Sequence, residues 1–176
     1  MQYRRSDTKG GTYFFTINLA DRTSNLLVKN IEHLRLALRK TKAAHPFDIV
    51  AMVVMPDHMH ILMELPDGDS DYPLRVRLIK AYFTKSLPQT EAINSTRLSK
   101  GERGIWQRRY WEHQIRDQQD LNNHINYIHI NPVKHGYVKN PIDWAFSTIH
   151  KFVRLQVLPE DWGCDITSFQ QEGFGE

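Results

Sequence analysis

Two histidines, His58 and His60, stand two residues apart within an apolar run over residues 49–65. Side chains of a strand alternate between its two faces, so both imidazoles should project from one face while Met59 and Ile61 project from the other. Two imidazoles that converge from a rigid strand can begin a metal site. A His-x-His pair is common, and taken alone it is more often two histidines that are hydrogen-bonded within a core.

Tyr127 and Asn131 are four residues apart in a stretch with helical periodicity, which places both side chains on one helix face. If that face lies over the two histidines, a tyrosine hydroxyl stands beside two imidazoles and a carboxamide oxygen. Such mixed nitrogen and oxygen ligation suits Mg²⁺ or Mn²⁺. A phenol, with an ordinary pKa of about 10, is a plausible nucleophile only where a metal polarises the phosphate that it attacks.

Both residues also have ordinary interpretations. Tyr127 fits a half-buried helix tyrosine with its hydroxyl hydrogen-bonded. Asn131 fits the last residue of a helix that Pro132 ends. Because a proline disfavours helical geometry in the residue before it, the prediction that Asn131 shares a helix face with Tyr127 is weaker than the other assignments.

Length and composition predict one domain with one core over residues 1–176, in which residues 141–176 form a C-terminal extension that is acidic from about residue 156. The single cysteine, Cys164, excludes an internal disulfide and any multi-cysteine metal centre. The apolar runs are too short for a membrane span and the N-terminus lacks a signal-peptide pattern, so we expect a soluble, cytoplasmic protein associated with the nucleoid.

Charge is distributed unevenly along the chain. All 23 lysines and arginines lie within residues 1–155 together with 15 acidic residues, a net charge of +8, whereas residues 156–176 hold five acidic residues and no basic one. A basic body with an acidic tail suggests a polyanionic partner such as nucleic acid, although a solvated surface of mixed charge fits the same numbers.

Hydrophobic periodicity and turn residues predict the elements that position these side chains. In order, they are a strand over 13–19, a helix over 31–45, a hairpin of strands over 47–55 and 58–65, a helix over 74–87, a strand or strand edge over 105–115, and a helix from the capping residue Asp117 to Asn131-Pro132. Residues 88–104 resemble a polar loop. This order predicts an α+β fold, a ferredoxin-like or RRM-like antiparallel sheet with helices on its faces.

Three segments resemble the single-tyrosine HUH transposases: VVMPDHMH at 53–60, IWQRRYWEH at 105–113 and YIHINPVKHGYV at 127–138. Within that superfamily of IS200-like transposases, YRR at 3–5, GGTYFFT at 10–16 and the segment 143–148 are similar to the REP-associated tyrosine transposases. The likeness extends over most of the chain, with the three long motifs in the family's order.

The resemblance implies a HUH endonuclease fold, with His58 and His60 as ligands of a divalent metal, Mg²⁺ or Mn²⁺. It further implies that Asn131 is the third ligand, where insertion-sequence relatives typically have a longer glutamine, and that Tyr127 is the nucleophile. The implied reaction is a transesterification on single-stranded DNA that gives a 5′-phosphotyrosine and a free 3′-hydroxyl, without ATP.

The implied partner is single-stranded hairpin DNA of the REP type, bound by a monomer, with a dimer as the alternative. Basic and aromatic side chains are predicted to contact this DNA through phosphates and unpaired bases. The predicted contacts are Arg4, Arg5, Lys9, Arg75, Arg77, Lys80, Arg108, Arg109 and Tyr110, with Tyr3, Lys85 and Trp106 as further candidates.

Alternatives stay open from the sequence alone. An RRM-like sheet can bind single strands or hairpins without chemistry, and such a module would expose aromatic residues on its sheet face. A hydrolase of the metallo-β-lactamase type also uses His-x-His but would have further metal ligands directly after it, where this chain has Ile61 and Leu62. Mobile insertion-sequence transposases and replication initiators share the HUH chemistry.

Overall fold

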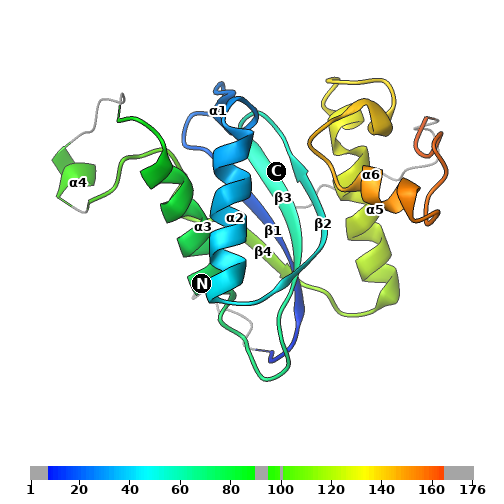
Figure 1. Ribbon diagram of the computed structural model, residues 1–176, viewed down its shortest axis with the longest axis horizontal. Helices are drawn as coiled ribbons and strands as arrows, with labels where there is room; N and C mark the ends of the chain where they lie inside the picture. Colours follow the sequence, from blue (N-terminus) through cyan, green and yellow to red (C-terminus); the bar gives the residue numbers. More distant parts are fainter. Residues whose placement is uncertain (1–7, 90–94, 100, 165–176) are drawn as a thin grey trace, which may run out of the picture.

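The sheet at the centre of the computed structural model is four-stranded and antiparallel throughout, in the order β2-β3-β1-β4 (Figure 1). The structure describes residues 8–89, 95–99 and 101–164. The strands are β1 (Thr12–Asn18), β2 (Asp48–Val54), β3 (His58–Glu64) and β4 (Trp111–Gln114). The helices are α1 (Leu26–Lys29), α2 (Ile31–Ala44), α3 (Tyr72–Ser86), α4 (Ser95–Leu98), α5 (Gln118–Lys134) and α6 (Ile149–Arg154), with a 3₁₀ turn at Pro141–Asp143. The predicted α+β fold is confirmed.

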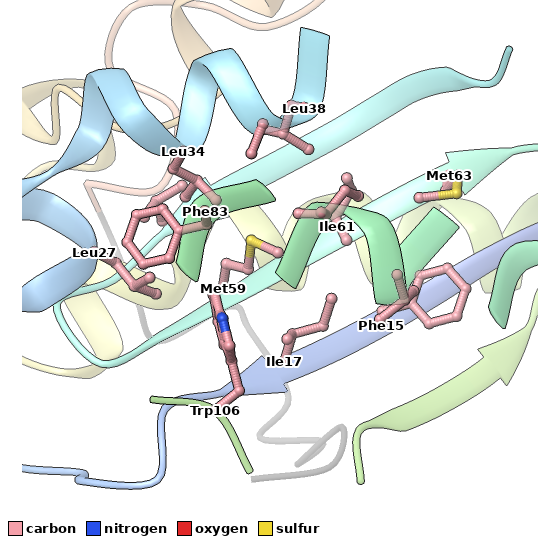
Figure 2. Close-up of a cluster of buried hydrophobic side chains, with 14 of the residues drawn as sticks. Phe15, Ile17, Leu27, Leu34, Leu38, Met59, Ile61, Met63, Phe83 and Trp106 are labelled. Atoms are coloured by element: carbon pink, nitrogen blue, oxygen red, sulfur yellow. The ribbon is translucent and has the colours of Figure 1, made fainter. Parts of the chain in front are cut away.

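Helices α2 and α3 pack side by side on one face of the sheet, and α5 covers the other face (Figure 1). Figure 2 shows the first layer, to which Phe15 and Ile17 of β1, Leu34 of α2 and Phe83 of α3 all belong. All four side chains are essentially inaccessible to solvent. Their burial provides the main hydrophobic stabilisation of the sheet.

The second layer is smaller and lies between the sheet and α5. Phe14, Val53 and Leu62 form its sheet side, and Tyr127 and Ile128 form its helix side. The predicted alternation along β3 is confirmed, because Met59, Ile61 and Met63 belong to the first layer while His58, His60 and Leu62 are on the α5 side.

Helix α5 begins where the sequence predicts and ends later. The Asp117 side chain accepts a hydrogen bond from the Asp120 backbone N–H and caps the first turn. The prediction that Asn131-Pro132 ends the helix is wrong, since the helix continues to Lys134. Pro132 removes one backbone donor, but the next turn still closes because His135 N–H donates to Asn131 O. Gly136 then adopts a positive φ of 72°, which ends the helix.

The fourth strand is shorter than the predicted stretch 105–115. Trp111 pairs with Thr16, so regular antiparallel pairing would place residue 108 opposite Leu19, but Leu19 forms an isolated bridge with Trp106 instead. Two extra residues are therefore accommodated between the bridge and β4, and the chain leaves the sheet there. The segment 107–110 lies beside α3, where the Lys80 ammonium donates to Gln107 O.

The C-terminal part of the described chain packs against the edge of β2. The Trp144 indole donates to Val54 O at 3.0 Å, and Ser147 forms a bridge with Val53. Trp162 contacts the ring of His129 in α5. Trp144 and Trp162 of this segment therefore pack on the domain. Within the described residues, no helix is long and apolar enough to cross a membrane.

Candidate active site on the helix α5 face of the sheet

His58 is the first residue of β3 and is held by a carboxylate. Its Nδ1–H donates to Asp57 Oδ1 at 2.8 Å, and the other Asp57 oxygen accepts from the Arg22 guanidinium. Burial lowers the pKa of His58 below its usual value, with the bond to Asp57 opposing this in part. His58 Nε2 is buried and has no hydrogen-bond partner among the described residues. A neutral imidazole with a buried, available Nε2 is the form that binds a metal.

His60 follows two residues later, and its ring lies next to that of His58, with centroids 4.9 Å apart. It faces Thr16 in the β1–β3 register, and the Thr16 hydroxyl shares a hydrogen bond of 2.9 Å with His60 Nδ1. Both Nδ1 atoms are thus engaged by side chains of the protein. Partners of this kind fix the ring orientation of metal-binding histidines and leave Nε2 for the ion.

Helix α5 brings Tyr127 to the histidines, and Asn131 follows one turn later on the same helix. The Tyr127 ring centroid lies 5.2 Å from that of His60, with the rings nearly perpendicular. Asn131 is fully buried, and its Oδ1 is enclosed, as is Nε2 of His60. The four side chains predicted as one site therefore come from two elements that pack together. Their donor set of two imidazole nitrogens and an amide oxygen fits a divalent cation.

The last residue of α5 and the C-cap residue that follows it border this site, and the sequence analysis missed both. The Lys134 ammonium lies 5.0 Å from the centre of the Tyr127 ring, and the His135 ring lies 5.4 Å from that of His58. His135 follows Asn131 by four residues, as Asn131 follows Tyr127. A prediction that the helix continues past Pro132 would therefore have placed His135 on the same helix face as these two residues.

A second group of potential metal ligands lies one turn before Tyr127. His113 of β4 donates through Nε2 to Asp120, and His124 lies against the same carboxylate, so that the ligand atoms lie within 4.8 Å of one another. Burial would raise the pKa of Asp120, but hydrogen bonds from His113 and Arg116 outweigh it and lower the pKa to about 2. The His113 and His124 rings stack with an interplanar angle of 13° and centroids 4.7 Å apart.

The predicted DNA contacts fall into different environments. Lys9, Arg77, Arg108 and Arg109 are exposed, and Lys80 and Tyr110 are half-buried beside α3. Arg4, Arg5 and Tyr3 lie outside the described residues, as does the acidic tail from Asp165 onward.

Two of the predicted contacts are wrong because tertiary partners bury them. Arg75 is 1% exposed, and its guanidinium donates to Pro46 O, Asp71 O and the Asp69 carboxylate. Trp106 is 8% exposed, and its indole donates toward α3. Neither side chain can reach a ligand without disrupting the core.

Comparison with known proteins gives matches over most of the chain. The family model for IS200-like transposases matches residues 11–131. The REP-associated tyrosine transposase of Escherichia coli strain K12 is 46% identical over 96% of this chain and 94% of its own length. A relative in Haemophilus influenzae that bears the same family name is 49% identical over 92% of both chains. A solved structure of a REP-associated tyrosine transposase bound to a REP hairpin superposes with a TM-score of 0.85 at 44% identity, covering 100% of this chain and 97% of that one.

Proposed function

Since the chain belongs to the IS200-like transposase family, and within it to the REP-associated tyrosine transposases, we propose that it cleaves and rejoins single-stranded DNA at REP-type hairpins with Tyr127 as nucleophile. The observation that carries this proposal is the position of the Tyr127 ring, whose centroid lies 5.2 Å from that of the His60 ring. A tyrosine beside a divalent-metal ligand set is suited to attack a phosphodiester.

Each residue of the site has a distinct role in this proposal. His58, His60 and Asn131 hold Mg²⁺ or Mn²⁺, which when bound polarises the scissile phosphate and offsets its charge. Asp57 and Thr16 orient the imidazoles through their Nδ1 atoms. Packing on Phe14 fixes the Tyr127 ring, with centroids 6.0 Å apart, so that the phenol is held ready in one orientation.

The proposed reaction exchanges one phosphoester for another. The Tyr127 oxygen loses its proton to solvent and forms a bond to phosphorus while the bond from phosphorus to the DNA 3′ oxygen breaks. That oxygen takes up a proton and leaves as a 3′-hydroxyl, and the 5′ phosphate stays attached to Tyr127. Because the phosphotyrosine ester retains the bond energy, a 3′-hydroxyl of another strand can attack it and join the DNA without ATP.

The proposed partner is hairpin DNA, because the similar solved structure holds a REP hairpin and the described surface carries exposed arginines near the sheet edge. We propose that one chain, acting as a monomer, forms a single catalytic domain with Tyr127 acting on the metal site of its own chain. This is consistent with Tyr127 and the histidines meeting within one subunit.

The test is a cleavage assay with end-labelled REP-type hairpin DNA, in Mg²⁺, in Mn²⁺ and in EDTA, resolved on a denaturing gel. We expect a cleaved product in either metal and none in EDTA, and loss of the product when both His58 and His60 are replaced by alanine. Tight hairpin binding without cleavage in either metal would contradict the proposed chemistry and favour a DNA-binding module without catalysis.

A further inference from the structure

Helix α5 carries a lysine at its C-terminal end that lies over the ring of Tyr127. The helix continues past Pro132 to Lys134, and the Lys134 ammonium is 5.0 Å from the centre of the Tyr127 ring. Because Lys134 follows Tyr127 by about two helical turns, the two side chains share one face of α5. Lys134 is exposed to solvent, whereas Tyr127 is buried.

The other groups around Tyr127 bring little net charge to the site. The Asn131 amide is uncharged, and the Asp57 carboxylate is compensated by the Arg22 guanidinium, which donates to it. The Lys134 ammonium is therefore a full positive charge placed beside the nucleophile of the proposed reaction.

A positive charge at this place suits the phosphate that Tyr127 attacks. A phosphodiester has one negative charge on its non-bridging oxygens, and the attack adds to it because the phenol gives up its proton. The new bond forms at the rim of the ring over which the ammonium lies, and the flexible four-carbon stem of lysine lets Nζ move from the ring to a phosphate oxygen. Preorganised charges at the place where negative charge develops usually make the largest single contribution to catalysis.

A lysine at the end of a helix also has a structural role. Its charge interacts favourably with the negative end of the helix dipole, and its stem covers apolar surface. The two roles differ in what they affect. The dipole interaction contributes to the stability of the fold, whereas a phosphate contact contributes to the binding and cleavage of DNA at one linkage.

We propose that Lys134 is a catalytic residue whose ammonium binds a non-bridging oxygen of the scissile phosphate while the Tyr127 oxygen attacks, and keeps this contact in the 5′-phosphotyrosine. The inference deepens the proposed function and rests on it. Lys134 neither gains nor loses a proton, and the bonds that form and break are those of the proposed reaction. The same contact therefore serves cleavage and joining.

The first test is the rate of cleavage in a single turnover, with the full chain in excess over labelled REP-type hairpin DNA in Mn²⁺, so that weaker binding does not limit the rate. Lys134→Met removes the charge and keeps the length of the stem, whereas Lys134→Arg keeps the charge. The matched control is Lys42→Met, at an exposed lysine in the last turn of α2, which packs on the other face of the sheet.

We expect Lys134→Met to cleave about 100-fold more slowly than the wild type, because it loses a charge that faces the transition state. Lys134→Arg should recover most of the rate, and Lys42→Met should cleave like the wild type. Thermal unfolding of each variant measures the structural role separately.

The second test measures binding without cleavage. The wild type is first used to map the cleaved linkage, and that linkage is then made either as the ordinary phosphodiester or as an uncharged methylphosphonate. The affinity of the protein for each DNA is measured in EDTA. We expect the wild type to prefer the phosphodiester by about tenfold, and Lys134→Met to bind both DNAs equally. Because two DNAs are compared on one protein, a change in its stability does not alter this preference.

Cleavage by Lys134→Met at the wild-type rate would overturn the assignment, and so would a preference for the phosphodiester that persists in this variant. A rate for Lys134→Arg as low as that for Lys134→Met would overturn it as well, because arginine keeps the charge. Failure of the proposed function has a different signature: the wild type would cleave no linkage in either metal, so the mapping would fail before any variant is compared.

Discussion

At the residue scale, the candidate metal site depends on side chains that do not touch the ion. Asp57 accepts from His58 Nδ1 and is itself held by Arg22, and Thr16 engages His60 Nδ1. The Asp57 carboxylate can only accept, so it keeps a proton on His58 Nδ1 and leaves the lone pair on Nε2, whereas the Thr16 hydroxyl orients the His60 ring. The predicted ligands therefore act together with neighbours that the sequence did not single out.

Replacing Asp57 tests this arrangement. Asp57→Asn removes the carboxylate that holds His58 while preserving its size, so we expect Mn²⁺ to bind about 10- to 100-fold more weakly, as measured by calorimetry without DNA. Asp48→Asn is the control, since Asp48 is an exposed carboxylate that pairs with Lys42 at the start of β2. Unchanged Mn²⁺ affinity in folded Asp57→Asn would mean that the ion is held elsewhere.

At the element scale, α3 is fixed to the rest of the fold by a buried arginine. Arg75 donates to Pro46 O within the α2–β2 connection and to the Asp69 carboxylate before the helix. These bonds join three segments at one point. A buried guanidinium with all its partners in place stabilises such a junction, and removing it leaves those partners unsatisfied.

The adjacent exposed arginine provides a matched comparison. We expect Arg75→Met to lower the free energy of unfolding by about 3 kcal/mol in urea titrations, whereas Arg77→Met should change it by less than about 0.5 kcal/mol. The effects on binding of hairpin DNA should be the reverse: the folded Arg75 variant should bind normally, and the Arg77 variant should bind more weakly, because Arg77 is an exposed residue that is predicted to contact DNA. A stability loss in both variants, or in neither, would contradict the distinct roles of the two residues.

The same residues show how far the sequence could predict the elements. Alternation along β3 and the four-residue spacing of Tyr127 and Asn131 are local patterns, and local patterns determined which faces these side chains occupy. The burial of Arg75 depends on Pro46 O, 29 residues away, and no local pattern encodes such a partner. The shortened β4 likewise results from the bridge between Leu19 and Trp106, a tertiary contact.

At the scale of the whole molecule, α5 connects the sheet face that carries Tyr127 and the histidines to the C-terminal segment. His129 is fully buried on α5, with Nε2 3.0 Å from the Thr148 hydroxyl and its ring edge to face with Phe152. Burial lowers the pKa of His129 to about 4, with a smaller contribution from His150. Its neutral form is therefore the one that the folded protein accommodates.

The sign of the pH effect follows from this pKa. In the unfolded chain His129 binds a proton at its ordinary pKa of 6.5, whereas in the folded protein it does so only near pH 4. The contribution of neutral His129 to the free energy of unfolding is therefore fully present above pH 6.5 and is lost as the pH falls toward 4. We expect His129 to contribute a loss of about 3 kcal/mol over this range, in addition to losses from His58 and His124, whose pKa values burial also lowers.

Urea titrations between pH 7 and pH 4 measure this loss. The His129→Gln variant should lose less stability over the range than the wild type, although it starts from a lower value. His33→Gln, a change at an exposed position of α2, should follow the wild type. If the free energy of unfolding falls with pH by the same amount in wild type and in His129→Gln, His129 is not a source of the acid sensitivity.

The central claim is that Tyr127 becomes joined to DNA, and the most direct measurement is identification of the attached residue. Wild type is incubated with hairpin DNA and Mn²⁺, digested with nuclease and protease, and analysed by mass spectrometry. We predict a nucleotide 5′-phosphate on the peptide that contains Tyr127, absent in Tyr127→Phe and retained in Tyr137→Phe, a change at the exposed tyrosine just after α5. Attachment at another residue, or cleaved DNA with no attached peptide, would contradict the account.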